Sequence, residues 1–215
     1  ITKLQDIKNA VEIVIKKEGK IDLLVNNAGM GISGSVENTL RKSAKYIFDV
    51  NVFGPFELAK EIVPYMRKAG HGKIINISSL AAIIYLPFQG FYSSTKAALN
   101  MLFNSMQLEL KPYNISITNI MPGDIKTEFT SNRQKNPKDD EVYKNRIEKS
   151  LAVMEKGEQN GMPPQAVANC VLKVAKASKP KLNIVVGLKY KVLVCIIKIL
   201  PASLVERIIY LIYGG

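Results

Sequence analysis

The chain is poor in the residues that build metal sites and disulfide frameworks. Its 215 residues include two cysteines and one histidine. Cys170 and Cys195 are too few and too far apart to form a disulfide framework or a zinc site, and no metal site is expected. So little cysteine is typical of a reducing compartment, and we expect a cytoplasmic protein. His71 lies between two glycines, where we expect a loop residue rather than a catalytic one.

Long apolar runs are also missing. The apolar runs at 192–197 and 208–212 are shorter than the roughly 20 residues that a membrane-spanning helix needs. The N-terminus shows no signal-peptide pattern. Because the sequence begins with isoleucine rather than methionine, we expect it to be part of a longer protein.

The composition is that of a globular protein with a basic surface. Apolar residues make up 47% and charged residues 22% of the chain, which is typical of one domain with its own core. The net charge is +12, but the lysines are scattered, and no basic stretch is interleaved with aromatic residues. A nucleic-acid partner is therefore not expected. The charge favours anionic ligands, such as a phosphate-rich cofactor or an acidic membrane surface.

Apolar periodicity alternates between strand and helix spacing along the chain. This alternation predicts an α/β fold, with a parallel sheet that helices cover on both faces. Short buried strands are predicted at 21–25, 73–78, 115–120 and 182–186, and helices at 4–18, 39–67 with an interruption near 51–55, 91–110 and 164–177.

Two segments depart from this alternation. The polar stretch 128–160, with helical potential at 140–156, is too long for an ordinary connection and predicts a functional lid. The apolar segment 189–213 has two readings: a helical flap over a substrate pocket or a subunit contact, which we favour, and an interfacial membrane helix with lysine anchors. We expect residues 1–188 to form one domain and 189–215 an apolar helical extension of it.

Tyr92 and Lys96 carry the strongest chemical signal. Four residues apart, they share one face of the predicted helix 91–110. An ammonium beside a phenol favours the phenolate and so is expected to lower the pKa of Tyr92. Such a phenol can donate a proton to a carbonyl oxygen or accept one from an alcohol. Ser79 ends the strand upstream, and Asn51 lies where the helix is interrupted. Taken singly, Ser79 could cap a turn, Asn51 break a helix and Lys96 be solvated.

Together with Asn26-Asn27-Ala28-Gly29 and Pro122 to Thr127, these residues resemble the short-chain dehydrogenase/reductase family in order and spacing. The resemblance implies a Rossmann-like doubly wound parallel sheet and hydride transfer between NAD or NADP and a carbonyl or alcohol. It implies a catalytic tetrad in which Tyr92 moves the proton, Ser79 binds the substrate oxygen, Lys96 tunes Tyr92 and binds the ribose, and the Asn51 carbonyl holds a relay water. The residues that it places at the cofactor are Asn26, Ala28, Gly29, Tyr92, Lys96, Pro122, Gly123, Ile125 and Thr127.

The resemblance also shows what is missing. A member of the family opens with a strand, a glycine-rich turn and a helix that holds the pyrophosphate. Only the last four strands of the family's order 3-2-1-4-5-6-7 are expected here, so the fold is incomplete. The segment Gly29–Gly34 approximates the glycine spacing but follows the wrong strand. Strand 21–25 becomes an exposed apolar edge, and the chain alone is expected to bind dinucleotide poorly. The residues that would distinguish NAD from NADP at the adenosine ribose belong to the missing segment, so the choice between the two is left open.

Two functions from different classes follow. The first is an NAD(P)-dependent oxidoreductase acting on a lipophilic alcohol or ketone, which Leu86, Phe88, Phe91 and the apolar tail favour. We expect it to form a homo-oligomer through the apolar faces of 56–66 and 97–108. The alternative is a catalytically inactive half-fold that acts as an interaction or membrane-surface protein. Intact Asn51, Ser79, Tyr92 and Lys96 argue for the first, and the missing glycine-rich turn for the second.

Overall fold

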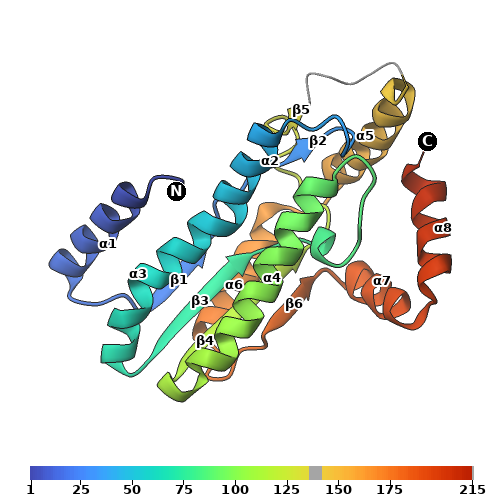
Figure 1. The fold of residues 1–215 in the computed structure, drawn as a ribbon. Coiled ribbons are helices and arrows are strands. Elements are labelled where there is room, and N and C mark those ends of the chain that lie inside the picture. The colour runs from blue at the N-terminus through green and yellow to red at the C-terminus, as the bar shows by residue number, and fades with distance from the viewer. Residues whose placement is uncertain (136–141, 215) are drawn as a thin grey trace.

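Four parallel strands form the centre of the computed structural model, which describes residues 1–135 and 142–214 (Figure 1). The strand order is β1-β3-β4-β6, and every neighbouring pair is parallel. This confirms the predicted α/β fold with a parallel sheet. The strands are β1 (Leu23–Asn26), β3 (Gly72–Ile77), β4 (Ile115–Pro122) and β6 (Asn183–Val186), with a separate short pair, β2 (Ile32–Ser33) and β5 (Gln134–Lys135).

Helices cover both faces of this sheet. On one face α1, α3 and α4 pack on β1, β3 and β4 around Phe103 and Ile74, which are fully buried. On the other face α6 packs against Ile75, Ile120 and Val186. The α-helices are α1 (Leu4–Glu18), α2 (Arg41–Phe48), α3 (Gly54–Ala69), α4 (Gly90–Leu110), α5 (Lys144–Gln159), α6 (Pro164–Lys176), α7 (Leu188–Ile199) and α8 (Ala202–Tyr213).

The predicted interruption near Asn51 is a π-helical turn, η1 (Asp49–Phe53). It joins α2 to α3, so that the three elements form one continuous helix. Pro55 follows directly in α3 and has no backbone N–H to donate to the turn before it. Single π turns often occur at functional sites because they redirect side chains and carbonyls. Here the turn holds the buried Asn51.

An asparagine ladder crosses the whole sheet at one register. Asn26, Asn76, Asn119 and Asn183 are aligned on the four neighbouring strands. The amide of Asn26 donates to Asn76 Oδ1 at 2.8 Å, that of Asn76 donates to Asn119 Oδ1 at 2.8 Å, and that of Asn119 donates to Asn183 Oδ1 at 3.1 Å. Buried amides must be paired with one another to avoid a desolvation cost. The ladder therefore fixes the register of the four strands, at the carboxyl ends of β1 and β3, in the middle of β4 and at the start of β6.

The edge strand and the histidine are found as the sequence predicted. Leu23 and Val25 on the edge strand β1 are both 37% exposed, which agrees with the predicted apolar edge. His71 is an exposed turn residue whose Nε2 lies 2.9 Å from Asp22 Oδ1, as predicted for a loop histidine. The helix expected at 140–156 is α5, and residues 140 and 141 of that prediction lie outside the described residues. None of the described helices is long and apolar enough to cross a membrane.

Candidate active site

A cavity of about 1100 Å³ lies where the carboxyl ends of the strands meet α4, α7 and α8. In open parallel sheets this edge is where ligands bind. Its polar wall includes Ser79, Tyr92 and Lys96, and its opposite wall is apolar and comes largely from α7 and α8. The structure thus brings together three of the four predicted catalytic residues in one cavity.

Lys96 is buried, and its ammonium donates a hydrogen bond to the Ile77 carbonyl at 2.9 Å. Burial, which penalises the charged form, lowers the pKa of Lys96 to about 8. The ammonium lies 5.8 Å from the centroid of the Tyr92 ring. Lys96 is therefore a titratable amine at the floor of the cavity, held by the end of a strand.

The expectation that Lys96 lowers the pKa of Tyr92 needs correction. Burial raises the pKa of Tyr92, and the hydrogen bond with Ser79 acts in the opposite direction as the largest lowering influence. More distant charges follow, with Glu158 raising the pKa and Arg133 lowering it. Lys96 is not among these causes, and its ammonium donates to the Ile77 carbonyl. The spacing of the two residues indicates the neighbouring charge but not how far the phenol is desolvated.

Ser79 both caps a short helix and contacts Tyr92. Its Oγ accepts a hydrogen bond from the Ala81 amide at 3.1 Å and so caps the short helix η2 (Leu80–Ala82). The same side chain hydrogen-bonds Tyr92 and lines the cavity. The cap therefore fixes the hydroxyl beside the phenol instead of competing with that position.

Asn51 lies behind the cavity wall. Its amide bonds both backbone groups of Met30, with Nδ2 donating to the carbonyl and Oδ1 accepting from the N–H, each at 2.9 Å. Nδ2 also lies 3.0 Å from Thr95 Oγ1 on α4. A Cβ placed at Gly29 would be 3.5 Å from both Asn51 Oδ1 and Lys96 Nζ. Asn51 therefore ties the segment after β1 to α4 right beside the lysine, and its side chain is fully used in doing so.

The residues predicted at the cofactor divide into two groups. Asn26 is in the asparagine ladder and Ala28 lies outside the cavity wall, whereas their neighbour Asn27, absent from the predicted set, lines it. The ladder could not be seen in the sequence because it depends on strand register. Seven of the nine predicted cofactor residues line the cavity, namely Gly29, Tyr92, Lys96, Pro122, Gly123, Ile125 and Thr127.

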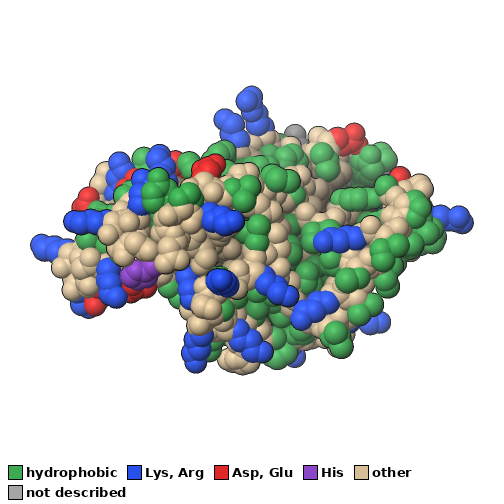
Figure 2. All heavy atoms as spheres, turned by 90° about the horizontal axis from the view of Figure 1, so that it is seen from below, with side chains coloured by type: hydrophobic (Ala, Val, Ile, Leu, Met, Phe, Trp, Pro, Cys, Tyr) green, Lys and Arg blue, Asp and Glu red, His purple; other side chains and the backbone are tan. Residues whose placement is uncertain are grey.

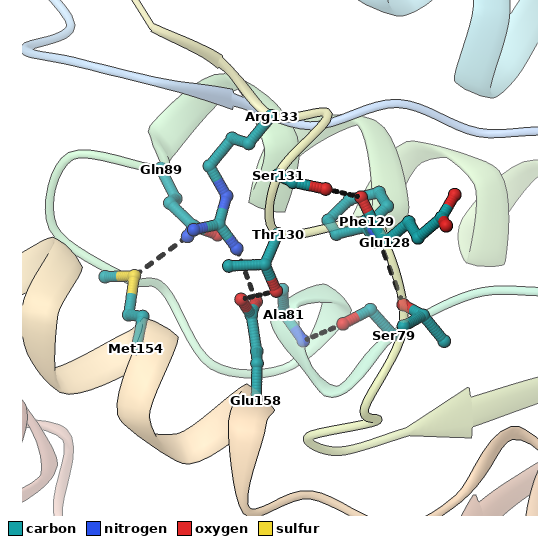
Figure 3. A network of polar contacts seen from close by, with 11 residues as sticks. Ser79, Ala81, Gln89, Glu128, Phe129, Thr130, Ser131, Arg133, Met154 and Glu158 are labelled. Atoms are coloured by element: carbon teal, nitrogen blue, oxygen red, sulfur yellow. Dashed lines mark hydrogen bonds and ion pairs between the residues drawn. The ribbon is translucent and has the colours of Figure 1, made fainter.

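The segment 127–135 packs on Tyr92 and binds α5, and Figure 3 shows its contacts with Glu158. The ring of Phe129 packs on that of Tyr92, with centroids 5.5 Å apart. Two residues of the segment bind Glu158 of α5: Arg133 forms an ion pair with it, and Thr130 Oγ1 donates to its Oε2 at 2.5 Å. The side chain of Arg133 is only 2% exposed. A buried ion pair thus joins the two ends of the predicted lid, 128–160, a contact that sequence reasoning did not find.

Two hydrogen bonds join α7 to the segment after β4. The Tyr190 hydroxyl accepts from the Asp124 N–H at 2.9 Å and donates to Asp124 Oδ2 at 2.7 Å. A Cβ at Gly123 would lie 2.3 Å from the Tyr190 ring, so only glycine permits this approach. The apolar tail is therefore fastened to the cavity rim, which agrees with the favoured reading of a flap over a pocket.

The three apolar residues expected to favour a lipophilic substrate do not all line the cavity. Leu86 lines the cavity, whereas Phe88 packs on α5 with Ile147 and Met154 and is buried outside it. Phe91 is likewise not part of the cavity wall. The segment Gly29–Gly34 leads into β2, and a Cβ at Gly31 would come within 2.9 Å of the Phe129 ring. That glycine serves side-chain packing, which agrees with rejecting the segment as a phosphate loop.

Comparison with known proteins decides the family. Residues 1–138 match the family described as short chain dehydrogenase. This chain belongs to the short-chain dehydrogenase family. It is an oxidoreductase, and members of the family use NAD or NADP. The family membership covers the stretch that holds Asn51, Ser79, Tyr92 and Lys96.

Individual relatives agree. The chain is 36% identical over 189 residues to a 3-ketodihydrosphingosine reductase of Bacteroides thetaiotaomicron, covering 87% of this chain and 70% of that protein. A short-chain dehydrogenase structure from Streptomyces avermitilis matches with a TM-score of 0.83 at 26% identity, over 95% of this chain and 75% of that one. A 7α-hydroxysteroid dehydrogenase complexed with NADH and 7-oxo glycochenodeoxycholic acid matches with a TM-score of 0.69 at 29% identity, over 86% and 70%.

Proposed function

We propose that this dehydrogenase transfers hydride between a nicotinamide cofactor and a lipophilic carbonyl or alcohol, with Asn51, Ser79, Tyr92 and Lys96 as its catalytic tetrad. The observation that carries the proposal is one cavity in which Ser79, Tyr92 and Lys96 meet a mainly apolar wall. The inactive half-fold has less support, because an interaction protein has no need for a buried lysine beside a tyrosine and a serine.

Tyr92 donates a proton to the carbonyl oxygen in reduction and accepts it from the alcohol in oxidation. Ser79, held by its cap on η2, donates a hydrogen bond to the same oxygen and stabilises the charge that develops there. Lys96 supplies positive charge to the cavity floor, and with a pKa of about 8 it remains mostly protonated at neutral pH. Asn51 positions the segment after β1 against α4 and so holds Lys96 and Gly29 in place.

The nicotinamide half of NAD or NADP fits the residues present. Lys96 has three donors and directs one to the Ile77 carbonyl, which leaves donors for the hydroxyls of a ribose. Gly29 beside it has no side chain to obstruct a sugar, and Pro122, Gly123, Ile125 and Thr127 form a wall for the ring. The cofactor, when bound, supplies the hydride. Binding of NADH by the 7α-hydroxysteroid dehydrogenase supports this assignment.

A lipophilic substrate is supported by the opposite wall. Val205, Ile209 and Ile197 of α7 and α8 contribute to a surface that offers few hydrogen-bond partners. Two of the similar proteins are named with a keto compound, 3-ketodihydrosphingosine in one and a 7-oxo bile acid conjugate in the other. We therefore propose a ketone whose carbonyl lies at Tyr92 and whose apolar part lies against α7 and α8.

The substrate proposal is tested with ketones of increasing alkyl length, using the full-length protein and each cofactor in turn. Each methylene buried against the apolar wall contributes about 0.8 kcal/mol, so kcat/KM is expected to rise about threefold to fourfold per carbon until the wall is covered. A rate that is flat or falls with chain length would contradict the lipophilic assignment and leave the chemistry intact.

Residues 1–188 are proposed to form the oxidoreductase domain and 189–215 an apolar helical extension of it, since Tyr190 joins α7 to the cavity rim. We further propose a homo-oligomer through α3 and α4. On α4, Met101 and Leu108 are 69% and 71% exposed, and Tyr65 on α3 is 37% exposed. Light scattering that gave the mass of a single chain would contradict the oligomer.

A further inference from the structure

Helix α7 has a third side that faces neither the core nor the cavity, and this side is apolar. Tyr190 and Val194 face the core and are buried. Leu188, Val192 and Ile199 do not line the cavity and are 78%, 52% and 82% exposed. Their spacings of four and seven residues place them on one stripe of the helix. A helix side that only met water would be expected to carry polar residues.

Helix α8 repeats the arrangement. Val205 and Ile209 are buried on its inner side and line the cavity. Leu204, Tyr210 and Leu211, which lie outside the cavity wall, are 42%, 59% and 74% exposed. Hydrophobic side chains accordingly gather over the end of the molecule formed by α7 and α8 (Figure 2). We call the outward sides of these two helices the outer face.

The charges beside the outer face are mostly positive. Lys189, Lys191, Lys198 and Arg207 lie on the two helices, against one acid, Glu206. On the helical projection of α7, Lys191 and Lys198 flank the apolar stripe on one edge and Lys189 on the other. Figure 2 shows basic side chains among the apolar ones at this end. An apolar stripe edged by lysines suits a surface that is apolar inside and anionic at its boundary.

We propose that the outer face of α7 and α8 docks on an anionic membrane surface. The helices then lie in the boundary region, with Leu188, Ile199 and Leu211 among the acyl chains and the lysines at the headgroups. A second copy of this chain is a poorer partner, because a symmetric contact through this face would bring its lysines and Arg207 together. The net charge of +12 adds long-range attraction to the same surface.

Docking also orients the cavity. Leu193 and Ile196 of α7, together with Ile208 of α8, line the cavity and are 40% to 47% exposed, so the cavity is open beside the outer face. A lipophilic substrate would then pass from the bilayer to Tyr92 without crossing water. This last point rests on the proposed function, whereas the docking itself does not.

Vesicle flotation of the full-length protein tests the docking. The protein is expected to float with vesicles that contain phosphatidylserine or phosphatidylglycerol, and much less with pure phosphatidylcholine, and added salt should weaken the binding. The double variant Ile199→Glu/Leu211→Glu should lower vesicle binding at least tenfold. The matched control Ile13→Glu/Val36→Glu, at positions 65% and 60% exposed, changes the charge equally and should float as wild type does.

The outcomes separate docking from the alternatives. Failure of the wild type to float, or equal loss in the control variant, would overturn the proposal. A lower mass for Ile199→Glu/Leu211→Glu by light scattering without vesicles would assign the outer face to self-association and would overturn it too. Tyr92→Phe should float as wild type does. A protein that reduces ketones in detergent yet never floats would refute the docking alone.

Discussion

At the residue scale, the tyrosine, serine and lysine could be placed from their order in the sequence, but their electrostatics could not. Tyr92, Ser79 and Lys96 meet in one cavity as the motif spacing indicated. The pKa of Tyr92 is raised rather than lowered, because desolvation of a phenol depends on what packs over it. The packing residue, Phe129, comes from a segment whose sequence matches no family motif. Long-range packing therefore sets what the motif alone leaves open.

The buried lysine should be visible in the pH dependence of stability. Lys96 loses its proton at a pKa of about 8 in the folded chain, against an ordinary value of 10.5. Between these values the unfolded chain binds more protons, so the free energy of unfolding gains a contribution that grows as pH rises from about 8 to 10.5. Lys96→Met removes this contribution.

Urea unfolding of both proteins across that pH window measures the effect. Relative to wild type, the stability of Lys96→Met should decline steadily from pH 8 upward. Parallel curves for the two proteins would show that Lys96 titrates at its ordinary pKa and is not buried as described.

Removing one partner of the Arg133–Glu158 ion pair should lower the free energy of unfolding more than replacing both. Glu158→Ala leaves the guanidinium of Arg133 buried without its counter-charge and is expected to destabilise the fold by about 3–5 kcal/mol. The double variant Arg133→Met/Glu158→Leu should recover most of that loss, because apolar residues can fill the same volume. A double variant as unstable as Glu158→Ala would contradict the account of the pair.

At the element scale, the strands, the main helices and their order could be predicted, because a parallel sheet imposes strand–helix alternation. The β2–β5 pairing and the two-helix form of the tail could not. β2 and β5 are two-residue strands joined across about a hundred residues, too short for any periodicity. Asn26 was placed at the cofactor because of its motif, whereas its partner is Asn76, one strand away in the sheet. Register is a property of a pair of strands, so the sequence of one strand alone does not predict it.

The attachment of α7 to the cavity rim gives a prediction at this scale. Gly123→Ala places a methyl group where the Tyr190 ring lies, so α7 must move away from the segment after β4. We expect faster amide hydrogen exchange in α7 and a rise in KM for a lipophilic ketone. Tyr190→Phe keeps the ring and removes the bonds of its hydroxyl to Asp124 and Lys189, so its effect should have the same direction and be smaller. Unchanged exchange in α7 for both variants would contradict this attachment.

At the scale of the whole molecule, the cavity of this short-chain dehydrogenase is assembled from elements far apart in the sequence. The strand ends supply Ser79, helix α4 supplies Tyr92 and Lys96, and the tail supplies an apolar wall. The sequence predicted the first two from motif order, and it left the tail between a flap and a membrane contact. The structure shows that α7 and α8 have sides for both, one turned to the cavity and one outward.

The most direct test of the central claim is the single-turnover rate of hydride transfer in Tyr92→Phe of the full-length protein, with Tyr113→Phe on the exposed surface as the matched control. Loss of a positioned general acid should slow hydride transfer by roughly 10²- to 10⁴-fold, with cofactor affinity retained and Tyr113→Phe equal to wild type. A Tyr92→Phe protein that transfers hydride at the wild-type rate would contradict the account.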